Sequence, residues 1–148
     1  MRLISHRGNI NGVEKELENT INYIDKANSV GYDVEIDVWY DNGFWLGHDE
    51  PQHPVTLEWL LNRSEFLWIH CKNFQALHML INIDGLTVFF HEQEKHTIIS
   101  NGLIWSHDIT VANNKCVVPL LSKDDIISWS PKHEVFGVCS DFIELLNG

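Results

Sequence analysis

The stretch Val34-Glu35-Ile36-Asp37-Val38 places two acidic residues, two positions apart, within a run of β-branched residues. Side chains alternate between the faces of a β-strand, so Glu35 and Asp37 are expected on one face and the apolar residues on the other. Two neighbouring carboxylates repel each other, and a hard divalent cation such as Mg²⁺, Mn²⁺ or Ca²⁺ would offset that repulsion. The same pattern is also typical of an edge strand with a solvated acidic face. The stretch therefore predicts either a metal site or such an edge.

The composition is that of one folded domain spanning residues 1–148. Of the 148 residues, 44% are hydrophobic and six are Trp, which is enough for a buried core. The formal net charge of −11 argues against nucleic acid as a partner. The three cysteines (Cys71, Cys116, Cys139) form no Cys-x-x-Cys pair and are expected to be free thiols in a reducing compartment. The N-terminal apolar run is too short for a signal peptide and no stretch has membrane-spanning length, so we expect a cytoplasmic protein without membrane insertion.

Strand and helix patterns alternate over the first ninety residues, which predicts parallel β-α-β units. The expected strands in this part are 3–5, 33–40, 66–72 and 87–90, and a hairpin turn at 41–43 leads into a strand at 44–46. The expected helices are 19–28, 57–61 and 74–81. Further strands are expected at 97–100, 103–106, 116–120 and 135–139, with helices from 123 and 141 to 146. The expected helix N-caps are Asn19, Thr56, Asn73, Ser122 and Asp141.

Polar side chains follow the ends of successive predicted strands. These side chains are His6 with Arg7, Asp37, His70 with Lys72, and His91 with Glu92. In a closed parallel barrel the carboxyl ends of the strands meet at one face, and the active site lies there. The pattern predicts one site at that face, because unrelated polar residues would be scattered over both ends of the strands.

Four motifs occur in order along the first third of the chain: Ser5-His6-Arg7-Gly8, Glu18-Asn19-Thr20, Glu35-Ile36-Asp37-Val38 and Gly47-His48-Asp49. In this order and spacing the chain resembles the glycerophosphodiester phosphodiesterase family, which is related to the phosphatidylinositol-specific phospholipases C. The resemblance covers residues 1–50 and extends to Lys72. It implies an α/β fold, specifically an abbreviated (β/α)8 TIM-type barrel with several helices trimmed or missing.

The resemblance also implies an activity, namely metal-dependent hydrolysis of a small glycerol- or polyol-type phosphodiester. It implies His6 and His48 as the general acid/base pair, a role for which imidazole is suited near neutral pH. It implies Glu35 and Asp37 as ligands of a divalent metal ion (Mg, Mn or Ca). Arg7 and Lys72 would bind the phosphate oxygens of the substrate.

The third metal ligand differs from the family, which has Glu two residues before the strand lysine. This chain has His70 there, which is either a ligand or a packed core histidine, and Glu92 is a candidate for restoring the missing negative charge. Two other functions remain open: a non-catalytic barrel that binds a phosphorylated metabolite or glycan, and a metal-dependent hydrolase of another ester class. Glu18 and Asn19 are expected to shape the first loop. The remaining histidines (His53, His78, His96, His107, His133) are expected in surface or packing positions.

Overall fold

The computed structural model describes residues 1–129 and 134–147, so His133 lies outside the described residues. Within them the chain is an α/β fold with a mixed ten-stranded sheet and four α-helices. The strands are β1 (Arg2–His6), β2 (Asp33–Tyr40), β3 (Phe44–Leu46), β4 (His53–Val55), β5 (Leu67–Cys71), β6 (Val88–Phe90), β7 (His96–Ile98), β8 (Ile104–Ser106), β9 (Cys116–Pro119) and β10 (Gly137–Ser140). The helices are α1 (Ile21–Ser29), α2 (Leu57–Asn62), α3 (Phe74–Leu80) and α4 (Lys123–Ser128), followed by the 3-10 helix η1 (Ile143–Leu146).

The sheet is built outward from β1, which lies between β2 and β10 and is parallel to both. On one side β2 pairs in parallel with β5, and β5 with β6. On the other side β10 pairs with β9, and β9 with β8. The parallel strands β1, β2, β5 and β6 confirm the predicted β-α-β units. The hairpin β2–β3 is also confirmed, and β3 continues the antiparallel pairing into β4.

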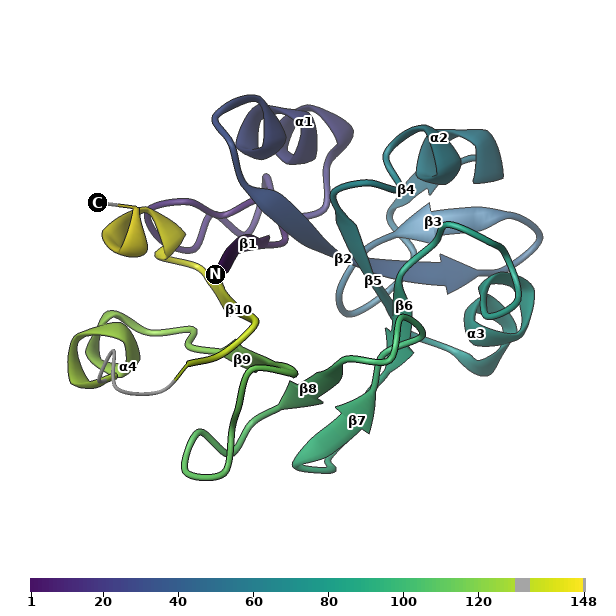
Figure 1. Cartoon of the computed structure of the whole chain (residues 1–148). Helices are drawn as coiled ribbons and strands as arrows, with labels where there is room; N and C mark the ends of the chain where they lie inside the picture. The colour runs from purple at the N-terminus through teal and green to yellow at the C-terminus, as the bar shows by residue number, and fades with distance from the viewer. Residues whose placement is uncertain (130–133, 148) are drawn as a thin grey trace.

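The sheet is strongly curved, and its strands lie around a common centre with the helices outside (Figure 1). Two hydrogen bonds join β6 to the segment that follows it. The Ser100 amide donates to the Val88 carbonyl oxygen at 2.8 Å, and the Thr97 hydroxyl donates to the Phe90 carbonyl oxygen at 2.8 Å. The series of strands on one side of β1 ends in β6, and these bonds link it to the segment of β7, which ends the series on the other side.

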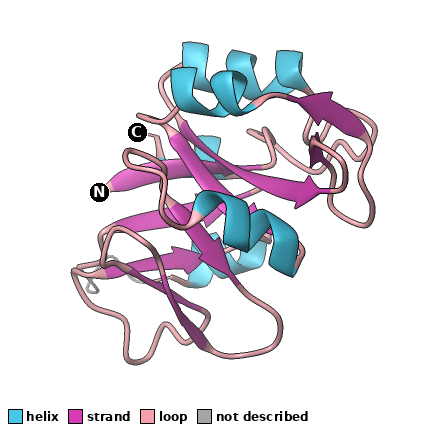
Figure 2. Ribbon diagram, turned by 90° about the vertical axis from the view of Figure 1, so that its right-hand side faces the viewer, coloured by secondary structure: helices cyan, strands magenta, loops and turns pink. Residues whose placement is uncertain are grey.

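The two faces of the curved sheet bury different sets of apolar side chains. Outward-facing residues of β2 and β5 pack beneath α1, α2 and α3, while those of β9 and β10 pack beneath α4 and η1. Figure 2 shows these helices against the strands from the side. The inner face carries a separate cluster formed by Ile4, Trp68, Phe89, Ile99, Trp105, Val117 and Cys139. The polar groups described below lie above this cluster, because the His70 ring stacks on Phe89 with 5.1 Å between the ring centroids.

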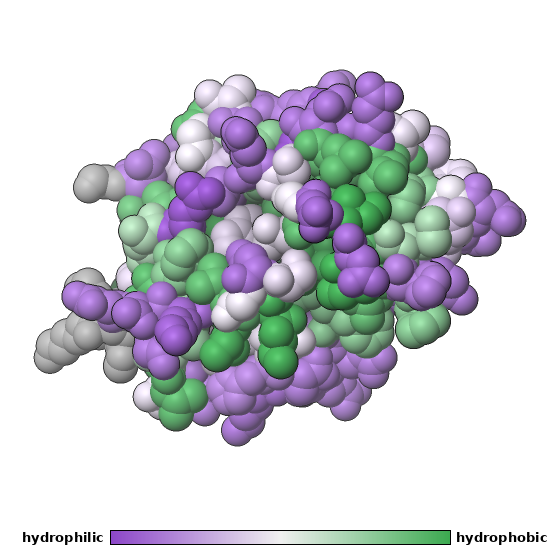
Figure 3. Space-filling model, turned by 45° about the vertical axis from the view of Figure 1, so that its right-hand side comes forward, coloured by the Kyte–Doolittle hydropathy of each residue, from purple (hydrophilic) through white to green (hydrophobic). Residues whose placement is uncertain are grey.

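No helix connects β6 to β7, so this part of the outer face stays uncovered. A groove lined by Leu77, Ile81, Phe90 and Ile98 runs along it, and Ile98 is 80% exposed. Figure 3, which brings this side of the molecule forward, shows hydrophobic surface between polar side chains. Within the described residues, no helix has the length and apolar character needed to cross a membrane.

Three of the five predicted helix caps are confirmed, namely Thr56, Asn73 and Ser122, and the last forms a capping box with Asp125. The cap of α1 is Thr20 and not Asn19, because the Thr20 hydroxyl accepts from the Tyr23 amide while the Asn19 side chain is engaged elsewhere.

Asp141 is not a cap either, because η1 follows Phe142 without any side-chain cap. Strand β4 is not among the strands predicted from the sequence. Pro54 lies on this edge strand, where its lack of an amide hydrogen is tolerated.

Candidate functional site

The acidic pair lies at the centre of the sheet, because β2 is flanked by β1 and β5. The pairing register sets His6 beside Glu35 and Asp37 beside His70, and all four side chains point to the inner face. Glu35 is 2% exposed and Asp37 is fully buried. The alternative of an edge strand with a solvated acidic face is therefore wrong, and the two carboxylates need another source of stabilisation.

Glu35, Asp37 and His70 form a group with the composition of a metal site. One ligand atom from each of them lies within 4.8 Å of the others. Glu35 Oε1 and Asp37 Oδ1 are buried and accept no hydrogen bond, although Asp37 Oδ1 lies 3.2 Å from His70 Nδ1. Buried oxygens without donors are costly unless a cation satisfies them, so these residues fit a divalent ion. Glu92 is exposed and lies outside the group.

The two carboxyl groups differ in acidity because their surroundings differ. Burial and the neighbouring Asp37 charge raise the pKa of Glu35 to about 7. Burial also opposes ionisation of Asp37, but the contacts with His70, Arg7 and Asn19 outweigh it and lower the pKa of Asp37 to about 2. At neutral pH Asp37 is therefore ionised, while ionisation of Glu35 is opposed by its surroundings.

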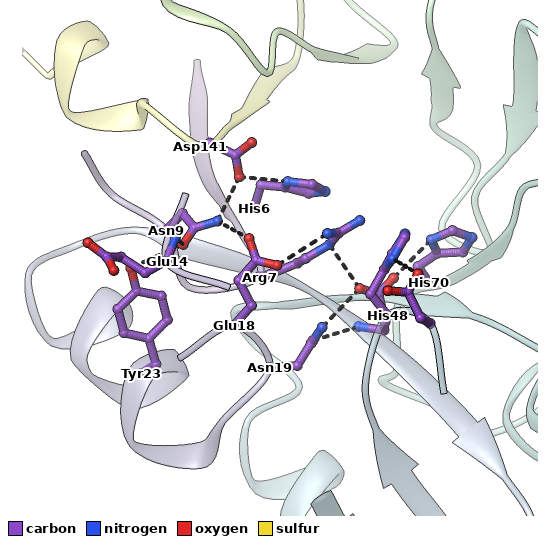
Figure 4. A network of polar contacts seen from close by, with 12 residues as sticks. His6, Arg7, Asn9, Glu14, Glu18, Asn19, Tyr23, His48, His70 and Asp141 are labelled. Atoms are coloured by element: carbon purple, nitrogen blue, oxygen red, sulfur yellow. Dashed lines mark hydrogen bonds and ion pairs between the residues drawn. The ribbon is translucent and has the colours of Figure 1, made fainter. Parts of the chain in front are cut away.

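Arg7 and Asn19 hold Asp37 from the side opposite His70. Both residues have left-handed backbone conformations, with φ of 59° for Arg7 and 60° for Asn19. The backbone amide of Asn19 donates to the Arg7 carbonyl oxygen at 3.1 Å. Arg7 Nε lies 3.1 Å from Asp37 Oδ2, and Arg7 Nη1 donates to Glu18 Oε1 at 3.3 Å. The Asn19 side chain donates to Asp37 Oδ2 and accepts from the Asp37 amide, each at 3.0 Å. These contacts point the Arg7 guanidinium across the site, between His6 and His48 (Figure 4).

His6 is oriented by a carboxylate from the other end of the chain. Its Nδ1 lies 2.8 Å from Asp141 Oδ1, so the predicted capping role of Asp141 is replaced by this contact. Burial opposes protonation of His6, but the hydrogen bond to Asp141 and the charge of Glu35 outweigh it and raise the pKa of His6. Within the described residues, His6 Nε2 makes no hydrogen bond, which leaves it available to a substrate.

Asn9 joins the His6 and Arg7 sides of the site. Its fully buried amide nitrogen donates to Asp141 Oδ1 at 2.8 Å and to Glu18 Oε2 at 2.6 Å. Its amide oxygen accepts from the Tyr23 hydroxyl at 3.1 Å and from the Glu14 amide at 3.2 Å. Every hydrogen-bonding position of the side chain is used, so Asn9 fixes the relative placement of the two acidic residues that hold His6 and Arg7.

His48 lies on the loop after β3 and repeats the arrangement of His6. Its Nδ1 lies 2.8 Å from Asp49 Oδ1, and its Nε2 has no hydrogen-bond partner among the described residues. The ring is more exposed than that of His6, at 40% of the side chain. Partial burial and the nearby Arg7 charge lower the pKa of His48. Of the two histidines, His48 is thus favoured in its neutral form and His6 in its protonated form, as a general base and a general acid require.

Lys72 and His91 lie at the rim beyond His70. Lys72 directly follows β5, and its backbone amide donates to the Val38 carbonyl oxygen at 2.8 Å. His70 Nε2 lies 3.1 Å from the His91 carbonyl oxygen, and the His91 ring stacks on His107 at 4.3 Å. His70 thus has a polar contact at each ring nitrogen, an arrangement that fits both a metal ligand and a packed core histidine.

No protein-family model, curated protein or solved structure matches this chain.

Its function has to be argued from the site itself. Sequence reasoning located His6, Arg7, Glu35, Asp37 and His70 near one another, and it missed Asn9 and the role of Asp141. The signal for Asn9 was its position directly after the Ser5-His6-Arg7-Gly8 motif. Asp141 had no local signal, because its partner is reached only through the pairing of β1 with β10.

Proposed function

We propose that this protein is a metal-dependent phosphodiesterase acting on a small glycerol- or polyol-type phosphodiester. The observation that carries the proposal is the burial of Glu35 Oε1 and Asp37 Oδ1 without a hydrogen bond, with Arg7 and His70 beside Asp37. A purely structural acidic pair would be expected to have its oxygens satisfied by donors. The resemblance to glycerophosphodiester phosphodiesterases supports the same assignment.

The architecture proposed for this site is an abbreviated TIM-type barrel. Support comes from the parallel run β8–β9–β10–β1–β2–β5–β6 and from the hydrogen bonds that link β6 to the segment of Thr97 and Ser100. The missing helix between β6 and β7 accounts for part of the small size. In such a barrel the carboxyl ends of the strands form the active face, where His6, Asp37 and His70 lie.

The chemistry assigns each residue a separate task. Arg7 and Lys72 bind non-bridging phosphate oxygens and offset the charge that develops on them. One histidine accepts the proton of a neighbouring substrate hydroxyl as its oxygen forms a bond to phosphorus, and the other donates a proton to the departing alcohol oxygen as that bond breaks. The cyclic phosphate is then opened by water with the two roles exchanged. A divalent ion held by Glu35, Asp37 and His70 would supply further positive charge to a phosphoryl oxygen.

The test is alcohol release from a panel of glycerophosphodiesters in the presence of Mg²⁺, Mn²⁺ or Ca²⁺, with and without a chelator. We expect turnover of at least one diester, lost on chelation and restored by added metal. No chelator-sensitive turnover on any of them would contradict the proposal.

A second candidate is a binding protein for a phosphorylated metabolite. It is favoured by the ion pairs of Asp37 with Arg7 and His70, which compensate its charge by protein groups alone. This candidate predicts that a phosphorylated ligand binds to the parent without turnover and still binds after replacement of His6 and His48 by Ala. It is contradicted if the parent cleaves the ligand it binds.

A further inference from the structure

A pocket of about 520 Å³ lies at the carboxyl end of β2. It is lined by the hairpin residues 39–42, by Pro51 from the loop that carries His48, and by Asn73 and Gln75 at the start of α3. Figure 1 shows the β2–β3 hairpin next to α3, which packs against β2. The volume is within the roughly 300–1,000 Å³ of small-molecule sites, so the pocket has room for one small ligand.

Trp39 supplies the aromatic wall of this pocket. It follows Asp37 by two positions on β2, so both side chains leave the strand on the same face, roughly 7 Å apart along it. The indole Nε1 of Trp39 donates to the Gly47 carbonyl oxygen at 2.7 Å, which fixes the ring beside the residue that precedes His48. A molecule that lies on the half-buried Trp39 ring is therefore adjacent to the candidate metal site and to its acid/base pair.

The other lining side chains offer both donors and acceptors. Within residues 1–129 and 134–147, the Asp41 carboxylate and the side-chain amides of Asn42 and Gln75 take part in no hydrogen bond or ion pair. Each amide both donates and accepts, and the carboxylate accepts. Asn73 is in contrast occupied, since its side chain accepts from the Tyr40 backbone amide and donates to the Tyr40 carbonyl oxygen. The available groups match alcohol hydroxyls, because a hydroxyl donates one hydrogen bond and accepts others.

The charges and rings of the lining disfavour two other kinds of ligand. None of the lining residues is Lys, Arg or His, and Asp41 is acidic, so the wall has no cation for a phosphate or a carboxylate. A quaternary ammonium ion is best enclosed by several aromatic rings, but the Tyr40 ring packs edge-on against Phe44 at 4.9 Å and leaves Trp39 as the open aromatic face of the lining. A single aromatic face bordered by amides and a carboxylate complements a sugar ring, whose C–H face stacks on the indole while its hydroxyls form hydrogen bonds.

We propose that this pocket binds a pyranose sugar, stacked on Trp39 and hydrogen-bonded by Asp41, Asn42 and Gln75, and that the sugar is the leaving alcohol of the phosphodiester. The inference rests on the proposed phosphodiesterase activity and specifies its substrate class as a glycerol–sugar phosphodiester. A hydroxyl of the glycerol part gives its proton to one histidine and forms the new bond to phosphorus. The bond between phosphorus and the sugar oxygen breaks, and this oxygen takes a proton from the other histidine. The free sugar leaves, and cyclic glycerol phosphate remains for hydrolysis by water.

The test compares two diesters that share the attacking glycerol and differ in the leaving alcohol. One is glycerol joined through phosphate to the primary hydroxyl of methyl β-glucopyranoside, and the other is bis-glycerol phosphate. Both are assayed with the parent, with Trp39→Leu and with Gln75→Ala. The matched controls are Trp59→Leu, at a half-buried tryptophan of α2, and Asn62→Ala, at an exposed amide of the same helix, and neither residue lines the pocket.

We expect the parent to favour the sugar diester in kcat/KM by about tenfold, the combined effect of one stacked ring and one hydrogen bond. The ratio of the two kcat/KM values should fall to nearly one in Trp39→Leu and by about threefold in Gln75→Ala, and it should stay unchanged in both controls. The ratio within one protein is insensitive to a shift of the His48 loop on loss of the bond from Trp39 to Gly47, because both diesters need His48.

Equal kcat/KM for the two diesters in the parent, or a preference that survives in Trp39→Leu or in Gln75→Ala, would overturn the inference and leave the phosphodiesterase proposal intact. So would a parent that cleaves other diesters but not the sugar diester. If no diester is turned over, the phosphodiesterase proposal fails, and saturation-transfer NMR with methyl β-glucopyranoside still tests the pocket. Transfer to the sugar protons with the parent, lost in Trp39→Leu and kept in Trp59→Leu, would support a sugar site. No transfer, or transfer to tetramethylammonium in place of the sugar, would contradict it.

Discussion

His6 and Asp141 are 135 positions apart in the chain, yet His6 Nδ1 and Asp141 Oδ1 lie 2.8 Å from each other. The contact exists because β1 and β10 are neighbours in the sheet, with Ser5 opposite Ser140. A carboxylate bound to Nδ1 fixes the tautomer of a histidine and favours its protonated form. The relationship gives His6 both its orientation and its raised pKa.

Replacement of Asp141 by Asn should lower the pKa of His6. In the folded parent the pKa of His6 lies above its ordinary value. The contact between His6 and Asp141 therefore stabilises the fold fully at pH values below the unfolded-state pKa of His6. This stabilisation is lost as the pH rises through the folded-state pKa of His6. In Asp141→Asn this part of the pH dependence of the unfolding free energy should disappear. NMR titration of the His6 ring and denaturation at a series of pH values measure the two effects. Asp84→Asn, on an exposed residue, is the matched control. An unchanged His6 pKa in Asp141→Asn would contradict the assignment.

Replacement of His6 or His48 by Ala should lower kcat by ~10²–10⁴-fold with a smaller change in substrate binding, because each ring exchanges a proton in the reaction. The double variant should be no more than about tenfold worse than the worse single variant, since the two rings act in one mechanism. His78→Ala on the exposed side of α3 controls for loss of a histidine as such. Fully multiplicative losses would argue against a shared mechanism.

The metal preference should depend on His70. A nitrogen ligand in place of a carboxylate weakens Ca²⁺ most, because Ca²⁺ prefers many oxygen ligands, and it favours Mn²⁺ by comparison. We expect higher activity with Mn²⁺ than with Ca²⁺ in the parent, and a shift towards Ca²⁺ or Mg²⁺ in His70→Glu. Calorimetric metal titrations of both proteins measure this. If His70→Glu leaves the preference unchanged, His70 is not a ligand.

Gly47 should be required for the placement of His48. Its φ is 154°, and a Cβ there would collide with the Glu50 carbonyl oxygen, while its own carbonyl oxygen accepts from Trp39 Nε1 at 2.7 Å. Gly47→Ala should destabilise the fold by roughly 1–3 kcal/mol and lower activity, because the loop must move. Gly43→Ala is the matched control, since its φ of 136° is also positive but a Cβ meets nothing within 4 Å. Equal melting temperatures for the two variants would show that the collision is relieved without cost.

The sequence predicted those features that depend on residues close together in the chain. The alternation of acidic and apolar residues around Glu35 and Asp37 determines which face they occupy, and the strand–helix order determines the parallel neighbours β1, β2, β5 and β6. The contact of Asn9 with Asp141 could not be predicted, because it depends on the pairing of β1 with β10, a strand more than a hundred residues later in the chain. The cap of α1 was misplaced because Asn19 and Thr20 are both good caps, and only the tertiary contact of Asn19 with Asp37 decides between them.

The position of β1 between β2 and β10 has a consequence for how the chain acquires its fold during synthesis. Strands β1, β2, β5 and β6 leave the ribosome early, but one edge of β1 has no partner until residues 137–140 have been made. An open central edge is a site for pairing with other chains, and contacts of such long sequence separation form slowly. The nascent protein therefore passes through a stage in which most of its sheet exists, its central strand is exposed to aggregation, and the carboxylate that orients His6 has not yet arrived.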